Sequence, residues 1–142
     1  MNTTEKNKIP NKLLSLFKYK CPRCRQGDMF IDKSSYKLKS FMKMYDHCSV
    51  CGQQMEIEAG FYYGTGYVSY ALAVAFSVST FVAWWVLIGF SVDDNRVFIW
   101  LIINSVLMLL LQPYFMRLSR AIWLSIFVSY DSNWRSVNII PN

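Results

Sequence analysis

Charged side chains are missing from two long stretches of the sequence. No Asp, Glu, Lys, Arg or His occurs in 59–92 or in 97–116. A buried helix of a soluble protein is seldom so long and so free of charge. We therefore expect two transmembrane helices, at about 67–90 and 97–116. The first would rise about 36 Å at about 1.5 Å per residue, enough to cross a hydrocarbon core of about 30 Å.

Familiar catalytic motifs are missing as well. The chain has a single histidine and no P-loop, HExxH or GxSxG segment, which are the signatures of common nucleotide-binding, metalloprotease and serine-hydrolase sites. No charged side chain lies inside either predicted span to indicate a transport path. We therefore expect neither an enzyme nor a transporter, and we identify no small-molecule substrate.

Basic residues are concentrated in the N-terminal part. Of the 15 Lys and Arg residues, 11 precede position 44, ahead of the first apolar stretch. Cations in this position hold a segment on the anionic cytoplasmic face of a membrane, which we favour over binding to nucleic acid. The first twenty residues contain no apolar run of signal-peptide length, so we expect the N-terminus to stay in the cytoplasm.

The short link between the two apolar stretches is acidic. It contains Asp93 and Asp94, whereas Arg117 and Arg120 follow the second stretch. So short a link forces an antiparallel two-helix hairpin, and the distribution of basic residues places both termini in the cytoplasm. The lipid bilayer is therefore the first expected partner, with the Asp-Asp tip on its opposite side.

Small side chains recur every four residues along the first span, at Ala71, Ala75, Ser79 and Ala83. Small residues allow helices to approach closely, so we expect this stripe to face the second helix rather than another protein. The polar Asn104 and Gln112 should point into the same interface. Pro113 should kink the second span, and the apolar segment 118–130, which is too short to cross, should form an interfacial helix.

All four cysteines occur in two close pairs. Cys21 and Cys24 form one CxxC pair, and Cys48 and Cys51 form the second after 23 intervening residues. This spacing predicts a zinc ribbon in which four thiolates hold a structural Zn²⁺. Iron held in the same way, as in a rubredoxin, is the alternative cofactor, because both metals take tetrahedral sulfur sites.

Apolar residues recur at helical spacing across 38–45, between the two pairs, and predict a helix that covers the ribbon. Met42 and Met44 lie close to His47 and are less favoured as copper ligands, because methionines at such positions are more often packing residues. Alternating apolar and acidic residues over 55–58 predict a short strand.

The segment that leads into the first span is rich in glycine and tyrosine. Gly60 and Gly64 would let it pack closely against another backbone, and Tyr67 and Tyr70 offer large contact areas with polar tips. We identify these four residues as a candidate surface for a membrane-protein partner. An aromatic belt that sets the depth of the first helix is an equal alternative.

The chain thus divides into a basic segment at 1–18, a cytoplasmic zinc ribbon at 19–60, a membrane unit at 61–130 and a polar tail at 131–142. The predicted fold class is a membrane protein with an N-terminal four-cysteine zinc ribbon, an antiparallel transmembrane two-helix hairpin and a C-terminal interfacial helix.

Several uncommon segments occur in a set order from about Phe17 to Asp131. They are CPRC at 21–24 followed by Gly27 and Phe30, CSVCG at 48–52, GFYYG at 60–64 leading into YVSYAL at 67–72, and PYFMRLSR at 113–120 before Trp123. In these segments the chain resembles the bacterial family catalogued as domain of unknown function 983. The resemblance implies a zinc-ribbon head and helices in the bacterial inner membrane, and it brings no established activity.

The resemblance also gives a lead towards respiratory complexes, because some relatives are encoded beside genes for haem-copper oxidase subunits and their assembly factors. We therefore expect a non-enzymatic, membrane-anchored adaptor or assembly factor for a larger inner-membrane complex. A membrane-tethered, rubredoxin-like electron carrier is the alternative. The metal would separate the two functions, since a ferric tetrathiolate is coloured and a zinc site is not.

Overall fold

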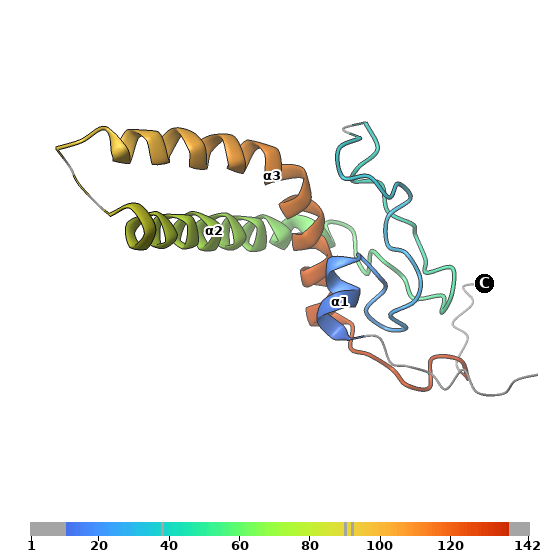
Figure 1. The fold of residues 1–142 in the computed structure, drawn as a ribbon. Coiled ribbons are helices and arrows are strands. Elements are labelled where there is room, and N and C mark those ends of the chain that lie inside the picture. The colour runs from blue at the N-terminus through green and yellow to red at the C-terminus, as the bar shows by residue number, and fades with distance from the viewer. Residues whose placement is uncertain (1–10, 38, 90, 92, 137–142) are drawn as a thin grey trace, which may run out of the picture.

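The computed structural model describes residues 11–37, 39–89, 91 and 93–136 of the chain. The helices among them are α1 (Lys12–Phe17), the 3₁₀ helix η1 (Phe61–Gly64), α2 (Thr65–Ile88) and α3 (Arg96–Phe127). The long helices α2 and α3 lie side by side, and the cysteine-containing segment at 19–60 gathers at one end of them (Figure 1). We call this segment the head.

The two predicted spans correspond to α2 and α3. The helical segments Phe61–Ile88 and Arg96–Phe127 are both long and apolar enough to cross a membrane. α2 ends at Ile88, and the next residue, Gly89, adopts a φ of +84° that other residues resist. These two helices indicate that the protein is associated with a membrane.

Polar side chains join α3 to α2 as the chain returns towards the head. Asn104 Oδ1 accepts a hydrogen bond from Thr80 Oγ1 at 3.0 Å, and Asn104 Nδ2 donates to Ser77 Oγ at 3.2 Å. Nearer the head, Ser69 Oγ donates to Ser119 Oγ at 2.9 Å. Asn104 therefore points between the helices, as predicted, because a polar group in an apolar environment needs a partner.

Two other predictions about this interface are wrong. The small residues expected to face α3 are exposed instead, namely Ala71, Ala75, Ser79 and Ala83. Gln112 is exposed as well. The interface uses larger side chains, with Phe76 packed on Phe115 and Phe81 packed on Trp100. Aromatic rings bury more apolar area than alanine, so they rather than the small residues fill the space between the helices.

α3 changes direction where its colour passes from orange to red-brown (Figure 1), and Pro113 lies inside this helix. Proline lacks the backbone N–H and its ring crowds the preceding turn, which bends a helix at this point, as predicted. Beyond the bend, α3 crosses the first part of α2, where Ser119 contacts Ser69, and then runs along the head to its end at Phe127. The interfacial helix predicted at 118–130 is thus the continuation of α3 and not a separate element.

The head and the C-terminal part of α3 share one hydrophobic core. Its buried members are Cys21, Cys24, Met29, Phe30, Cys48, Cys51 and Met55 of the head, with Ala121 and Leu124 of α3. Leu16 of α1 and Trp134, which follows α3, pack against the same core. α3 therefore forms one wall of the head, and the predicted polar tail contributes to its packing.

The backbone of the head is irregular. Among its described residues there is neither helix nor strand, and isolated antiparallel bridges join Lys20 to Asp28, Phe30 to Met44 and His47 to Gln54. Turns replace the helix predicted at 38–45, where Leu38 itself lies outside the described residues, and the strand predicted at 55–58 does not form. The cysteines are therefore positioned by turns.

Candidate metal centre

The first cysteine pair lies in a tight turn. Cys21 N donates a hydrogen bond to Gly27 O at 2.8 Å. At the base of the turn, the bridge between Lys20 and Asp28 is reinforced by an ion pair, with Nζ and Oδ1 2.6 Å apart. The amide N of Gly27 lies 3.5 Å from Cys24 Sγ. A backbone N–H thus points at a ligand sulfur and favours its thiolate form.

The second pair repeats this arrangement. Cys48 N donates to Gln53 O at 2.8 Å, and Gly52 N donates to Cys48 O at 2.9 Å. The bridge between His47 and Gln54 closes the base of this turn. His47 is half-buried, and in the described part of the chain the only group of residues that could hold a metal consists of the four cysteines.

Backbone conformation and close contacts explain which residue types occur next to the two cysteine pairs. The residue after each pair is left-handed, with φ of +56° at Arg25 and +70° at Gly52, and glycine adopts such a conformation without strain. Gly27 is needed for space, because a Cβ at this position would overlap Cys48 Sγ. The close approach at Gly27 lets the two turns meet.

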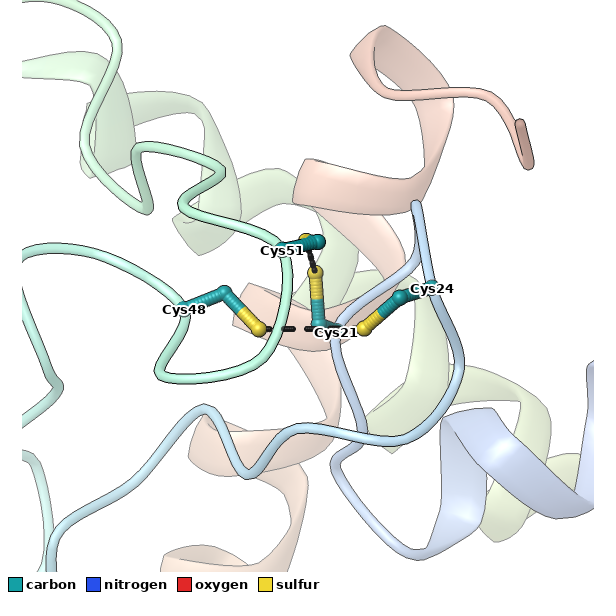
Figure 2. Close-up of side chains that lie close together, drawn as sticks. All are labelled: Cys21, Cys24, Cys48 and Cys51. Atoms are coloured by element: carbon teal, nitrogen blue, oxygen red, sulfur yellow. Dashed lines mark hydrogen bonds between the residues drawn. The ribbon is translucent and has the colours of Figure 1, made fainter. Parts of the chain in front are cut away.

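The two turns bring the four sulfurs together (Figure 2). All four Sγ atoms lie within 4.8 Å of one another. The sulfurs of Cys21 and Cys51 are 3.8 Å apart, and those of Cys24 and Cys48 are 3.7 Å apart. Sulfurs about 2.3 Å from a central metal are about 3.8 Å apart in a tetrahedron, whereas a disulfide requires about 2.05 Å. The cysteines therefore fit a tetrathiolate metal site.

The site is closed to solvent. The exposed fraction is 0% for Cys21, 1% for Cys24, 3% for Cys48 and 1% for Cys51. Burial raises the pKa of Cys51 to about 12. The hydrogen bond between Cys21 and Cys24 raises the pKa of the first thiol and lowers that of the second. A bound cation would stabilise all four thiolates together, and four ligands would leave no position for water.

Arg117 of α3 fastens the helix to the head. The side chain is fully buried, with an exposed fraction of 0%. It donates to three carbonyl oxygens, those of Phe41 at 2.6 Å, Asp32 at 2.9 Å and Lys33 at 3.4 Å, and it lies 4.6 Å from the ring centroid of Phe30. The backbone of the head wraps around this guanidinium, and one of the accepting carbonyls, that of Phe41, belongs to the segment in which turns replace the predicted helix.

Arg120 and Trp123 extend this contact by nearly two helical turns along α3. Arg120 Nη1 donates to Met42 O at 3.1 Å, and Trp123 Nε1 donates to Phe61 O at 2.8 Å. We refer to the contacts of Arg117 and Arg120 with the head, together with that of Trp123 with Phe61 of η1, as the seam. From the sequence, the two arginines served as a topology signal and as part of the segment 113–120 that carries the family resemblance. The spacing of three residues, which places all three side chains on one helix face, could have indicated the seam.

The segment after α3 is fastened to the first cysteine turn. Arg23 Nη2 and Asp131 Oδ2 are 3.2 Å apart, and Asp131 N donates to Arg23 O, also at 3.2 Å. The guanidinium of Arg25 lies 4.2 Å from the ring centroid of Tyr130. The turn that carries Cys21 and Cys24 is therefore held by residues more than a hundred positions away in the sequence.

The four candidate partner-binding residues fall into two groups. Gly64 packs on Trp123, since a Cβ there would overlap the indole ring, and Gly60 has a φ of +81°. Both glycines therefore serve the folding of the chain itself. Tyr67 and Tyr70 are 82% and 71% exposed, so they are free to contact lipid or a partner.

Comparison with known proteins gives one match. A family model described as a protein of unknown function, DUF983, matches residues 38–127. The matched range includes Cys48, Cys51 and the seam residues of α3, whereas Cys21 and Cys24 lie before it. No curated protein and no solved structure matches the chain.

Proposed function

The chain belongs to the DUF983 family of proteins of unknown function, and we propose that it is a non-enzymatic, membrane-anchored zinc-ribbon adaptor or assembly factor. The buried cluster of four cysteines carries this proposal, because a metal held by four thiolates has no open position for catalysis. Such a metal would keep the head rigid. The seam connects the head to α3, so that the head presents a fixed surface next to the apolar helices.

Zinc is the proposed metal, and iron is the alternative. Both fit sulfurs 3.7 to 3.8 Å apart, and an iron-loaded head would be a membrane-tethered electron carrier. Elemental analysis and an absorption spectrum of the purified full chain distinguish the two functions. One zinc per chain and a colourless protein would support the adaptor function. A coloured ferric site would instead support the electron-carrier function.

We place the head and both termini on the cytoplasmic side of the bacterial inner membrane, with Asp93 and Asp94 on the other side. The charge distribution supports this topology. Single reporter cysteines near Lys8 and Asn138 should be shielded from an impermeant reagent in intact cells, while one beside Asp94 should be labelled. The native cysteines are buried and should react little. The reverse labelling pattern would contradict the topology.

The proposed partner is a larger membrane complex, and the family resemblance favours a respiratory oxidase. Purification of the tagged protein in a gentle detergent should bring oxidase subunits with it. Tyr67 and Tyr70 are exposed and lie outside the seam. Replacing them therefore tests the proposed partner surface. Replacing both tyrosines by Ser should remove the oxidase subunits and leave the zinc content unchanged. Unchanged co-purification would leave these residues as an aromatic belt only.

A further inference from the structure

A cavity of about 370 Å³ lies between the head, η1 and the C-terminal part of α3. Its lining includes Tyr62 and Tyr63 of η1, Arg120 of α3, and Asp46 and Glu56 of the head. η1 leads directly into α2, so the cavity lies where the chain passes from the head to the first apolar helix. A cavity of this size can hold a small polar group.

Arg120 brings a positive charge to the cavity, where the charge of Glu56 acts on it without forming a close ion pair. Its Nη1 is bonded to Met42 O at 3.1 Å and lies 3.7 Å from Met44 Sδ, and the guanidinium stacks 4.8 Å from the ring centroid of Tyr62. No carboxylate of the described residues pairs with Arg120, and its buried Nε has no hydrogen-bond partner. An anion in the cavity would form the close ion pair that the guanidinium of Arg120 lacks.

Asp46 and Glu56 bring charges of the opposite sign to the same cavity. Both side chains are exposed, and neither takes part in an ion pair within the described part of the chain. These carboxylates would repel a ligand that carried only negative charge. A ligand that places an anionic group and a cationic group a few bonds apart would satisfy Arg120 and the carboxylates together.

The signs of the charges that line the cavity match one common lipid headgroup. We propose that the cavity binds phosphatidylethanolamine, with its phosphate at Arg120 and its ammonium at Asp46 and Glu56. The ammonium has three N–H donors for the two carboxylates. The phosphate is the part of this headgroup joined to the lipid body, and Arg120 belongs to the helix that continues into the apolar region. The assignment rests on the proposed membrane anchoring and is independent of the adaptor role.

Native mass spectrometry of the full, metal-loaded chain in mild detergent tests the assignment. The protein would be offered equal amounts of phosphatidylethanolamine, phosphatidylcholine and phosphatidylglycerol with identical acyl chains. Adducts with phosphatidylethanolamine should exceed the other two by about tenfold, because the choline group has no N–H donor and the glycerol group has no charge. Equal adducts with either competitor would overturn the assignment, as would equally good competition by soluble glycerophosphoethanolamine.

Matched variants locate the binding in the cavity. Glu56→Gln removes an exposed carboxylate and leaves the seam intact, so the preference for phosphatidylethanolamine over phosphatidylglycerol should fall to near one. Arg120→Gln should lower the adducts of both lipids, while Lys39→Gln, an exposed lysine outside the cavity, should keep the tenfold preference. A preference retained in Glu56→Gln would contradict the proposal.

Carbonate extraction separates this proposal from the membrane anchoring. A chain that resists extraction but shows no lipid preference contradicts only the phosphatidylethanolamine site. A chain that is extracted as a soluble protein contradicts the anchoring itself. The zinc content of each variant confirms that its head is folded.

Discussion

The two ends of α3 are held in different ways. Beyond Pro113 the helix is a wall of the core, with Arg117, Ala121 and Leu124 almost fully buried. Before Pro113 the described residues of α3 include no buried side chain, and α2 has none along its whole length. One end therefore buries its surface inside the chain, while the other leaves its surface to the surroundings, which we expect to be lipid.

Polar contacts differ in the same way. Next to the head, α3 uses the charged Arg117, which can be buried because three carbonyl oxygens accept its hydrogen bonds. Between the apolar helices, it uses the uncharged Asn104 with Thr80 and Ser77, since a charge is far more costly in lipid. The comparison teaches that equivalent substitutions along one helix should have unequal effects.

Loss of the metal should give the largest difference in stability between the part of α3 that packs on the head and the part in the apolar region. Cys48→Ser removes one of four ligands, and structural zinc in small domains contributes about 10 to 16 kcal/mol of apparent binding energy near neutral pH. We expect the head to unfold and the apolar helices to stay in the membrane. Limited proteolysis of membranes should cleave the head of this variant and spare α2 and α3. A protease-resistant head without metal would contradict the structural role of the site.

Replacing two matched arginines, one at each end of α3, should give the next largest difference in the stability of the head. Arg117→Gln leaves buried carbonyl oxygens without a donor, and hydrogen bonds to charged groups contribute about 1.5 to 3 kcal/mol each. We therefore expect a loss of about 3 kcal/mol or more in the stability of the head, measured as faster zinc transfer to a chelator. Arg96→Gln is the control at the other end of α3.

Arg96 is exposed and lies 3.5 Å from Asp94, an arrangement that contributes at most about 1 kcal/mol. Its replacement should leave the rate of zinc transfer unchanged. Equal rates in the two variants would show that the seam does not support the metal site.

The periodic and paired features of the fold were predictable from the sequence. The lack of charge indicated both long helices, Pro113 indicated the bend, and the two CxxC pairs indicated the four cysteines that the structure brings together. Each of these features depends on local composition or spacing. They can therefore be identified without knowledge of distant contacts.

The contacts between distant segments were not predictable. Arg117 bonds to carbonyl groups about eighty positions earlier, and no local pattern shows that a backbone segment will wrap around it. One of these carbonyl groups, that of Phe41, belongs to the segment 38–45, where turns stand in place of the expected helix. The stripe at Ala71 and Ala75 shows a related limit, because small residues mark a face that can pack closely but do not identify what packs on it.

Two neighbouring glycines provide a finer test of the seam. Gly64→Ala places a methyl group into the ring of Trp123, and such overpacking costs about 1 to 3 kcal/mol. Gly66→Ala meets no atom within 4 Å, and alanine in α2 should stabilise the helix by about 0.5 to 1 kcal/mol. Thermal unfolding followed by zinc release should therefore shift down for Gly64→Ala and not for Gly66→Ala. Downward shifts of equal size would contradict the close packing at Gly64.

The smallest difference between two matched variants is expected where α2 and α3 meet in the apolar region. Asn104→Ala removes the hydrogen bonds to Thr80 and Ser77, and such contacts between membrane helices contribute about 0.6 kcal/mol on average. Gln112→Ala is the matched control, because Gln112 is exposed and does not point between the helices. Amide hydrogen exchange of α2 in detergent should become slightly faster in Asn104→Ala and stay unchanged in Gln112→Ala. Neither variant should alter zinc release, because the head is held by the seam and its own core. A larger effect of Gln112→Ala than of Asn104→Ala would mean that the interface has the orientation expected from the small-residue stripe rather than the one observed.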